Sequence, residues 1–376
     1  MEVDDVLNAY IDLNLLLAIG VMLWLGLKWG LSRVGLGYAY RPQLRLLNAL
    51  TALLAICPVL ALALTSWAGA APTTLSDVLV AQYLSGNVSM SAGEFEALIG
   101  LRETSVRSLV SLQSTGAQIL AVGFAIGVAL CALRVCVSIL RLRKVIQNAF
   151  LWKKSGKVHV LVSDVTRVAF STRGWRRRYV VLPTSLLTAP TDLRLTVSHE
   201  LQHFRQNDIE FEFLLEFLRP LLFWNPAYHV WRREMQQLRE YACDQTLLAR
   251  QSFDVRAYCE CLIRASAFAA REQVLFTERS PIVPLVDRTE ARGGSALKRR
   301  ILAVASSSGR QGHAASWMML SGLLMAAVFA ATIAIQRPSD WSHDRIMLAT
   351  IVNLERMEQR SVQVDSPFAG GFVRAD

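Results

Sequence analysis

Four long apolar segments limit what this chain of 376 residues can fold into. An α-helix needs about 20 predominantly apolar residues to cross the hydrocarbon core of a bilayer. Segments of that kind occupy residues 11–27, 46–67, 117–140 and 314–336, and the third is interrupted only by Arg134 near one end. With 53% hydrophobic and 19% charged residues, the composition is typical of a multi-pass membrane protein that also has a soluble part.

The positions of lysine and arginine predict how these segments are oriented. Basic residues gather after the first segment, after the third and before the fourth, and such residues favour the inner side of a membrane. Residues 141–313 are therefore predicted to form one cytoplasmic domain, with the N-terminus outside. Residues 1–140 would hold three transmembrane helices with an outside loop at 68–115, residues 314–336 a fourth helix, and residues 337–376 a short outside tail.

The net charge of +10 does not require a nucleic-acid partner. Much of the excess lysine and arginine lies beside the apolar segments, so the lipid bilayer is the expected partner and no direct nucleic-acid contact is predicted. The six cysteines form no Cys-x-x-Cys pair, and none falls in a segment placed outside. A disulfide framework is therefore not expected, which agrees with a soluble domain in a reducing compartment.

The sequence His199-Glu200-Leu201-Gln202-His203 carries the strongest chemical signal. Residues four apart on a helix share one face, so both imidazoles can point at the same ion, and Glu200 is close enough to act as a general base without binding it. This is the arrangement of a zinc hydrolase, with Zn²⁺ held by the two histidines. The alternative is an ordinary amphipathic helix with two surface histidines. With only six histidines in the chain, chance alone would rarely produce this motif.

A catalytic zinc ion needs a third protein ligand. Glu240 is predicted to supply it from a later helix, and Asp244, four residues on, to hydrogen-bond the outer nitrogen of a ligand histidine. Asp208 is a candidate for that second role, although it could equally solvate the end of the first helix. Three side chains are weaker candidates to stabilise the transition state, and such side chains are more often structural: Tyr228, His229 and Tyr241.

Strands are expected ahead of the histidine pair. Valine-rich segments at residues 157–170 and 178–182 predict them, and a peptide substrate could add as a further strand beside 158–162 or 180–182. Pro190 predicts the first turn of the helix that carries the histidines, with Thr188 as its cap. The inner domain therefore combines strands and helices.

Three further segments are predicted from their polarity. Residues 77–84 and 94–112 could form short amphipathic helices in the outside loop. Residues 210–231 are apolar but contain acids and prolines, which favours a buried or interfacial helix broken at 219–220 over a membrane span. Residues 271–300 are polar and rich in proline and glycine, and are expected to be an exposed linker.

An ordered set of motifs matches a known family. The chain resembles the BlaR/MecR family of membrane zinc metallopeptidases, the antirepressor sensor-transducers of β-lactam resistance in bacteria. The resemblance covers residues 170–301 in motif detail and the four-span layout as a whole. The matching motifs are Ser198-His199-Glu200-Leu201-Gln202-His203 with Arg205 and Asp208, Phe223-Trp224-Asn225-Pro226, Arg239-Glu240-Tyr241-Ala242-Cys243-Asp244-Gln245, and Leu297-Lys298-Arg299-Arg300-Ile301.

The resemblance implies a fold and an activity. The fold would be a polytopic α-helical membrane protein of four spans with an α+β, gluzincin-like zinc metalloprotease domain facing the cytoplasm, placed in the bacterial cytoplasmic (inner) membrane. His199, His203 and Glu240 would bind Zn²⁺ and Glu200 would be the general base. Family members cleave themselves near the linker into the fourth span, and they cut, or trigger cleavage of, a DNA-binding repressor. The resemblance also allows a homodimer.

The chain departs from this pattern after the fourth span. Only about 40 residues follow, where the sensors carry a penicillin-binding domain, and residues 337–376 contain no Ser-x-x-Lys motif. Direct acylation by a β-lactam is therefore not expected. Two alternatives remain: a housekeeping membrane protease of the CAAX or HtpX type, and a non-catalytic membrane sensor or scaffold with a structural zinc site. The first shares the zinc residues, but the Phe223-Trp224-Asn225-Pro226 motif favours the BlaR/MecR type.

Overall fold

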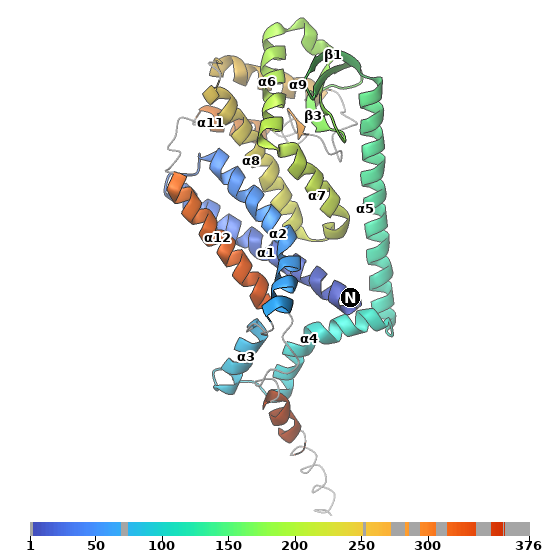
Figure 1. Ribbon diagram of the computed structural model, residues 1–376, viewed down its shortest axis with the longest axis vertical. Coiled ribbons are helices and arrows are strands. Elements are labelled where there is room, and N and C mark those ends of the chain that lie inside the picture. The colour runs from blue at the N-terminus through green and yellow to red at the C-terminus, as the bar shows by residue number, and fades with distance from the viewer. Residues whose placement is uncertain are drawn as a thin grey trace, which may run out of the picture. The chain divides into compact units, whose positions relative to one another are not determined.

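The structure is a computed structural model that describes residues 3–68, 74–250, 253–271, 283–285, 294–305, 314–335, 347–355 and 357. Helices dominate these residues, and one five-stranded sheet lies among them (Figure 1). The helices are α1 (Val3–Arg33), α2 (Tyr40–Ala68), α3 (Leu75–Leu84), α4 (Ala92–Ser111), α5 (Thr115–Asn148), η1 (Thr184–Thr188), α6 (Pro190–Gln206), α7 (Asp208–Leu222), α8 (Pro226–Arg250), α9 (Val255–Arg271), α11 (Gly294–Ala305) and α12 (Ala314–Ile335). The strands are β1 (Phe150–Ser155), β2 (Val158–Ser163), β3 (Phe170–Arg173), β4 (Arg178–Pro183) and β5 (Val283–Pro284).

Three of the four predicted spans are confirmed as helices long and apolar enough to cross a membrane. Within the described residues these are Val6–Arg33, Thr115–Asn148 and Ala314–Ile335. The remaining predicted span, residues 46–67, lies inside α2, but the side chains of residues 58–68 are outside the described part of the chain. A total of four spans therefore stays a prediction.

Backbone contacts divide the chain into two compact units. One contains Met1–Leu16, Leu53–Ala121 and Met325–Asp376, and the other contains Leu17–Ala52 and Val122–Leu324. The division cuts across the apolar helices, whereas the predicted boundaries at residues 140, 313 and 336 follow membrane topology. Those boundaries stay a prediction.

In the first unit, the predicted outside loop and part of the tail pack together. The loop forms α3 and α4, each started by a capping box in which Thr74 or Ser91 exchanges hydrogen bonds with an acidic residue three positions on. Tyr83 stacks on Phe95 with ring centroids 4.2 Å apart. The same apolar cluster includes Leu348 from the helix at residues 347–355. The two segments therefore share one small core.

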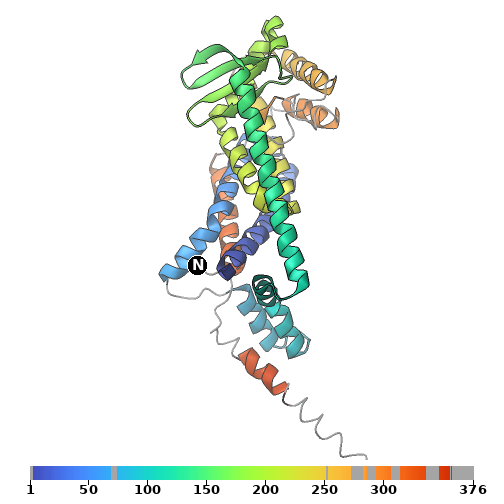
Figure 2. The same ribbon diagram turned by 90° about the vertical axis from the view of Figure 1, so that its right-hand side faces the viewer.

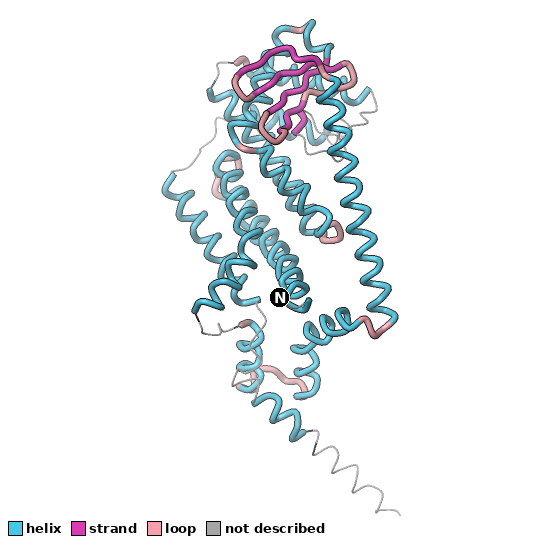
Figure 3. Tube along the Cα trace, turned by 45° about the vertical axis from the view of Figure 1, so that its right-hand side comes forward, coloured by secondary structure: helices cyan, strands magenta, loops and turns pink. Residues whose placement is uncertain are grey.

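The second unit contains the sheet, with strand order β1-β2-β4-β3-β5 (Figure 3). A tight turn at Gly156, with φ of +57°, joins the antiparallel strands β1 and β2. β2 and β4 are parallel, and β3 lies antiparallel to both β4 and β5. The strand predicted at residues 178–182 is confirmed as β4, and that at 157–170 is confirmed in part, since β2 ends at Ser163 and β3 begins at Phe170. Their position corrects another expectation: β2 and β4 are interior strands, so a substrate cannot add beside either.

Alternation along the strands gives the sheet two buried faces. Val160 and Val180 belong to a core shared with α6, α9 and α11, whereas Leu161 and Val181 pack on the opposite face against the last turns of α5. Figure 2 shows α5 passing beside the sheet. The helix partners are Leu195 and Phe204 of α6 on the first face, and Leu142 and Val145 of α5 on the second. α6 is thus held against one face of the sheet by a shared apolar core.

Three local predictions need correction. The prediction of an exposed linker at residues 271–300 is wrong for the described part of that segment. Leu285 and Arg300 are buried, and the segment contributes β5 and the start of α11. Residues 272–282 and 286–293 lie outside the described residues. Thr188 does not cap α6, because its hydroxyl bonds to Ser185 within η1, although Pro190 does begin the helix. The break predicted at residues 219–220 is also wrong, because α7 continues through Pro220 and ends at Leu222.

Candidate metal centre

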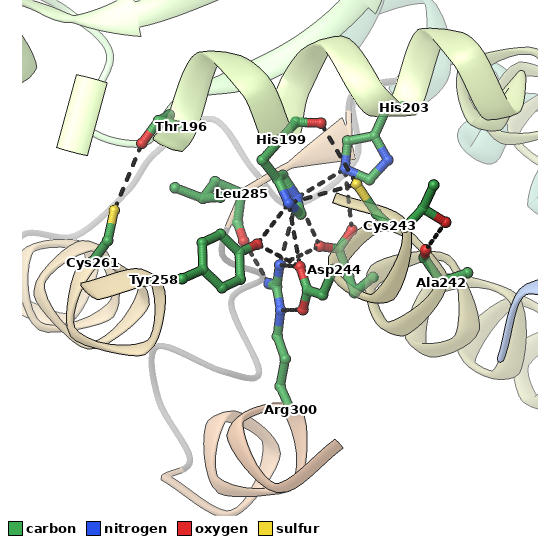
Figure 4. Close-up of polar contacts among 12 residues, drawn as sticks. Thr196, His199, His203, Ala242, Cys243, Asp244, Tyr258, Cys261, Leu285 and Arg300 are labelled. Carbon is green, nitrogen blue, oxygen red and sulfur yellow. Dashed lines mark hydrogen bonds and ion pairs between the residues drawn. The ribbon is translucent and has the colours of Figure 1, made fainter. Parts of the chain in front are cut away.

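Helix α6 places both histidines of the motif on its buried face. His199 and His203 are 0% exposed, and their Nε2 atoms lie 3.1 Å apart. The spacing of four residues stacks the two rings on consecutive turns. Figure 4 shows the two side chains projecting from α6 toward residues of other helices. The two Nε2 atoms therefore face one point, as a shared ion would require.

A tight turn after α6 orients the second histidine. Asn207 ends the helix in the left-handed region, with φ of 59° and ψ of 30°, and α7 begins at the next residue. This turn brings the carboxylate of Asp208 within 2.7 Å of His203 Nδ1. Because Nδ1 then carries the proton, Nε2 is left with a free lone pair. The structure thus gives Asp208 the orienting position that the sequence left open.

We expect Asn207→Val to destabilise the protein by about 1–2 kcal/mol or more, because branched L-residues strongly disfavour the left-handed region. Asn207→Gly should be nearly neutral, since glycine adopts this conformation freely. Thermal unfolding of the purified variants in detergent measures both effects. Equal stability of the valine and glycine variants would contradict the role given to the turn.

Helix α8 faces α6 and contributes three site residues. Glu240 places Oε2 at 3.4 Å from His199 Nε2 and Oε1 at 3.7 Å from His203 Nε2. Asp244, one turn further on, lies 3.2 Å from His199 Nδ1. The sequence predicted both proximities. It did not predict Cys243, whose Sγ lies 3.5 Å from His199 Nδ1.

The donor set fits a zinc ion. Zn²⁺ binds histidine nitrogen and carboxylate oxygen at about 2.0–2.2 Å, and tetrahedral geometry then separates neighbouring ligand atoms by about 3.3 Å. The two Nε2 atoms and the oxygens of Glu240 are 3.1 to 3.7 Å apart. Glu240 Oε2 is buried and accepts no hydrogen bond among the described residues. These atoms are therefore spaced to hold one ion.

His199, His203 and Cys243 also form a metal-competent group by distance, with ligand atoms within 4.8 Å of one another. The thiol, however, lies beside Nδ1 of His199 and interacts with the main-chain oxygen of the same residue. Its Sγ also lies within 4.8 Å of a ring nitrogen of His203, so the thiol borders the same cluster. Glu240 places its two oxygens 3.4 and 3.7 Å from the Nε2 atoms of His199 and His203, which is the position predicted for the third ligand.

Glu200 carries a fully buried carboxylate. It is 0% exposed, and within the described residues neither oxygen accepts a hydrogen bond. Burial raises the pKa of this carboxyl above its usual value, while His203 and His199 oppose the shift. A buried polar group without a partner costs free energy. Such a carboxylate suits a general base that acts on a water molecule.

Two residues that the sequence did not single out complete the site. Tyr258, on α9, places its hydroxyl 2.9 Å from His199 Nδ1 and donates to Asp244 Oδ1 at 2.5 Å. Arg300, on α11, bonds both oxygens of Asp244. Burial would raise the pKa of the Asp244 carboxyl, but the charge and hydrogen bonds of Arg300 hold it well below the usual range. Asp244 is thus a fixed anion behind His199.

Comparison with protein-family models decides the relationship of the chain. The model described as BlaR1 peptidase M56 matches residues 9–304, which is most of the sequence. The chain belongs to the BlaR1 peptidase M56 family. The match confirms the resemblance inferred from the motifs, and it makes the protein a membrane metallopeptidase of the BlaR1 type. A comparison with curated proteins gives no match.

Membership of the M56 family implies a metal, typically zinc, and the group of His199, His203 and Cys243, with Glu240 beside both histidines, is compatible with it. The three predicted transition-state donors lie in other surroundings. Tyr228 donates to Leu215 O at 2.6 Å, His229 donates through Nε2 to Phe223 O at 2.8 Å, and the ring of Tyr241 packs on Tyr40. None of these contacts is with the histidine pair, whereas the hydroxyl of Tyr258 reaches it.

Proposed function

We propose that the chain is a zinc endopeptidase that transduces a signal by cutting itself, a cytoplasmic regulator such as a repressor, or both. The observation that carries the proposal is the joint placement of the ligand atoms of His199, His203 and Glu240 beside the buried carboxylate of Glu200. A structural zinc site needs four protein ligands and no neighbouring base. A site with three ligands and such a base favours hydrolysis.

The residues divide the chemistry among them. Zinc, when bound, supplies a Lewis acid that polarises the scissile carbonyl and makes water a better nucleophile. Glu200 accepts the proton of the attacking water and passes it to the leaving amine. Asp208 and the Asp244–Tyr258 pair hold the two imidazoles, so that each presents Nε2 to the metal.

The position of β5 supports self-cleavage. Ser171 on β3 pairs with Val283 on β5, so a segment upstream of α12 already lies as an antiparallel edge strand. The hydroxyl of Ser171 also donates to the main-chain oxygen of Val283 at 3.5 Å. An edge strand next to the base is the position that an extended peptide substrate takes in strand-addition binding.

The test is to express the wild type and Glu200→Gln in membranes. Both should bind zinc, and only the wild type should yield fragments that end between residues 271 and 311. Loss of a general base lowers the rate by about 10²–10⁴-fold, so fragments should be lost from the variant. Equal fragmentation would contradict self-cleavage, and a wild type without zinc would contradict the metal site. Comparing new protein N-termini in the two cell populations would identify a regulator as substrate.

The proposed location is the bacterial inner membrane, with the peptidase side facing the cytoplasm, and the charge pattern supports it. Reporters fused near Gly93, in α4, should be outside, and reporters near Gly174, in the β3–β4 turn, should be inside. Measuring alkaline phosphatase and fluorescent-protein activities in cells distinguishes the two sides. The reverse pattern would place the site on the outer side.

A further inference from the structure

A buried arginine reaches the metal centre from the segment before α12. Arg300 is 0% exposed, whereas Lys298 and Arg299 beside it are exposed. The buried face of α11 otherwise carries small apolar side chains such as Ala303 and Val304. Fully buried arginine is rare, because desolvating the charge is costly unless it is paired. Arg300 must therefore be held by its partners.

These partners belong to three different parts of the site. Arg300 Nε donates to Asp244 Oδ2 at 2.7 Å and Nη2 donates to Oδ1 at 2.9 Å, which is a bidentate pair. Nη1 donates to the main-chain oxygen of Leu285, next to β5, at 2.6 Å. Nη2 also lies 3.0 Å from Glu240 Oε2, without the geometry of a hydrogen bond. Nη2 is also 3.5 Å from His199 Nε2. One planar group therefore contacts both His199 and Glu240, the anion behind His199, and the chain beside the sheet edge.

We propose that Arg300 is a positioning residue of the metal centre, an inference that rests on the zinc site proposed above. Its fork fixes Asp244, and Asp244 together with Tyr258 fixes the ring of His199. The same group limits how the carboxylate of Glu240 can turn. A guanidinium beside a metal site repels the metal by charge alone. Arg300 favours zinc binding only if the free energy gained by holding the ligands in place exceeds the free energy lost to that repulsion.

The two effects have opposite signs, so zinc affinity separates them. If Arg300 acted by charge alone, removing the charge would tighten zinc binding. If it acts by position, Arg300→Lys weakens binding although the charge stays, because an ammonium cannot form the bidentate pair. Loss of an outer contact of a metal ligand typically costs 10–100-fold in metal affinity, and about that loss is expected here.

The experiment measures the zinc dissociation constant by chelator competition on the full chain in detergent. Arg299→Lys is the matched control, since the neighbouring side chain is exposed on the same helix. Unfolding temperatures of the metal-free proteins check the fold. The double variant Arg300→Met with Asp244→Asn removes both charges of the bidentate pair, so neither member of that pair is left as an unpaired ion and the proposal is tested even if Arg300→Lys does not fold.

The expected result is weaker zinc binding in Arg300→Lys and in the double variant, with wild-type affinity in Arg299→Lys. Affinity within twofold of the wild type in a folded Arg300→Lys, or in the double variant, would overturn the positioning role. A wild type that binds no zinc would instead remove the proposed function, so the two failures are distinguishable.

A second inference concerns the hairpin formed by α7 and α8, which turns at residues 223–225. The ring of Phe223 packs against Phe124 of α5, with centroids 5.9 Å apart. It also fills the notch at Gly127, where a Cβ atom would overlap the ring. The tip of the hairpin therefore contacts the middle of an apolar helix predicted to cross the membrane.

Three contacts give the depth of that tip. Lys28, at the end of the first apolar segment, pairs with Glu234 of α8 at 2.6 Å, and Trp231 donates to Thr51, near the start of the second, at 3.0 Å. From Glu234 back to its first residue, Pro226, α8 runs for about 12 Å at 1.5 Å per residue, and the turn at residues 223–225 follows directly. Gly127 lies about 21 Å along α5 from Arg141, where the basic cluster begins. Both distances fall inside a hydrocarbon core of about 30 Å.

The surface of the hairpin fits that depth. Its exposed side chains include Phe217 at 76% and Trp224 at 51%. Its acidic groups Glu212 and Glu216 are turned inward and paired with arginines. Charges inside a membrane are expected to pair in this way. We propose that the α7–α8 hairpin inserts among the apolar helices as a re-entrant element, with Phe217 and Trp224 against lipid acyl chains.

Cysteine labelling tests this placement. Trp224→Cys and Phe217→Cys are compared with Trp175→Cys, whose side chain is 92% exposed in the β3–β4 turn. A membrane-impermeant maleimide is added to membranes opened to both sides, with the wild type as background. The control should be labelled at once, and the two hairpin variants should be labelled only after detergent or denaturant is added. Labelling of either hairpin cysteine at the rate of the control would overturn the insertion.

Discussion

Glu240→Gln is expected to strip the protein of zinc, whereas Cys243→Ser should retain it. An amide is a poor zinc ligand, so the variant would hold zinc with two histidines only. Loss of an outer contact of a ligand costs about 10–100-fold in affinity, and loss of a ligand itself should cost more than about 100-fold. Cys243 Sγ lies 3.5 Å from Nδ1 of His199, whereas the oxygens of Glu240 lie against the two Nε2 atoms, so we expect zinc to depend on Glu240 rather than on the thiol. Metal content per chain after dialysis, measured by atomic emission, gives the answer.

The two variants control for each other, because both residues lie on consecutive turns of α8. Glu234→Gln, further back on the same helix, controls for the loss of a carboxylate as such. Zinc retained by Glu240→Gln and lost by Cys243→Ser would show that the ion is held by the two histidines and the thiol. In that case Glu240 would keep only its contact with Arg300.

The local part of the site could be predicted from the sequence. His199, Glu200 and His203 lie within one helical turn, so the periodicity of the helix fixes their geometry before any tertiary contact forms. Glu240 and Asp244 are likewise one turn apart, and only the pairing of α6 with α8 had to be assumed. The apolar segments followed from length and composition, because a bilayer imposes a minimum helix length.

The long-range part could not be predicted. Tyr258 and Arg300 join the site from α9 and α11. Arg300 lies in one of the motifs shared with the BlaR/MecR family, but neither local sequence indicates a role at the metal centre. Arg300 lies in a basic run, which is typical of exposed surface, and its burial depends on Asp244, 56 positions earlier. The linker prediction failed for the same reason: β5 forms only because β3 offers an edge.

The inward-facing acids of the α7–α8 hairpin carry the other large expected effect. Glu212→Gln should destabilise the protein by about 3–5 kcal/mol, because removing one partner of a buried ion pair leaves an uncompensated charge. Glu212 is 1% exposed and accepts from Arg239 at 2.8 Å and from Arg232 at 2.9 Å. Arg239 precedes Glu240 on α8, so zinc affinity should fall together with stability.

Glu260→Gln is the matched control, since Glu260 pairs with Arg256 on the surface of α9 at 48% side-chain exposure. Exposed pairs contribute about 0–1 kcal/mol, so this variant should unfold almost as the wild type does. Denaturant unfolding in detergent micelles compares the two. If Glu212→Gln cost no more than Glu260→Gln, water would have to reach the cluster, and the hairpin could not lie in a hydrocarbon environment. The free energy of unfolding of the Glu212→Gln variant therefore tests both the support of the metal site and the position of the α7–α8 hairpin in the membrane.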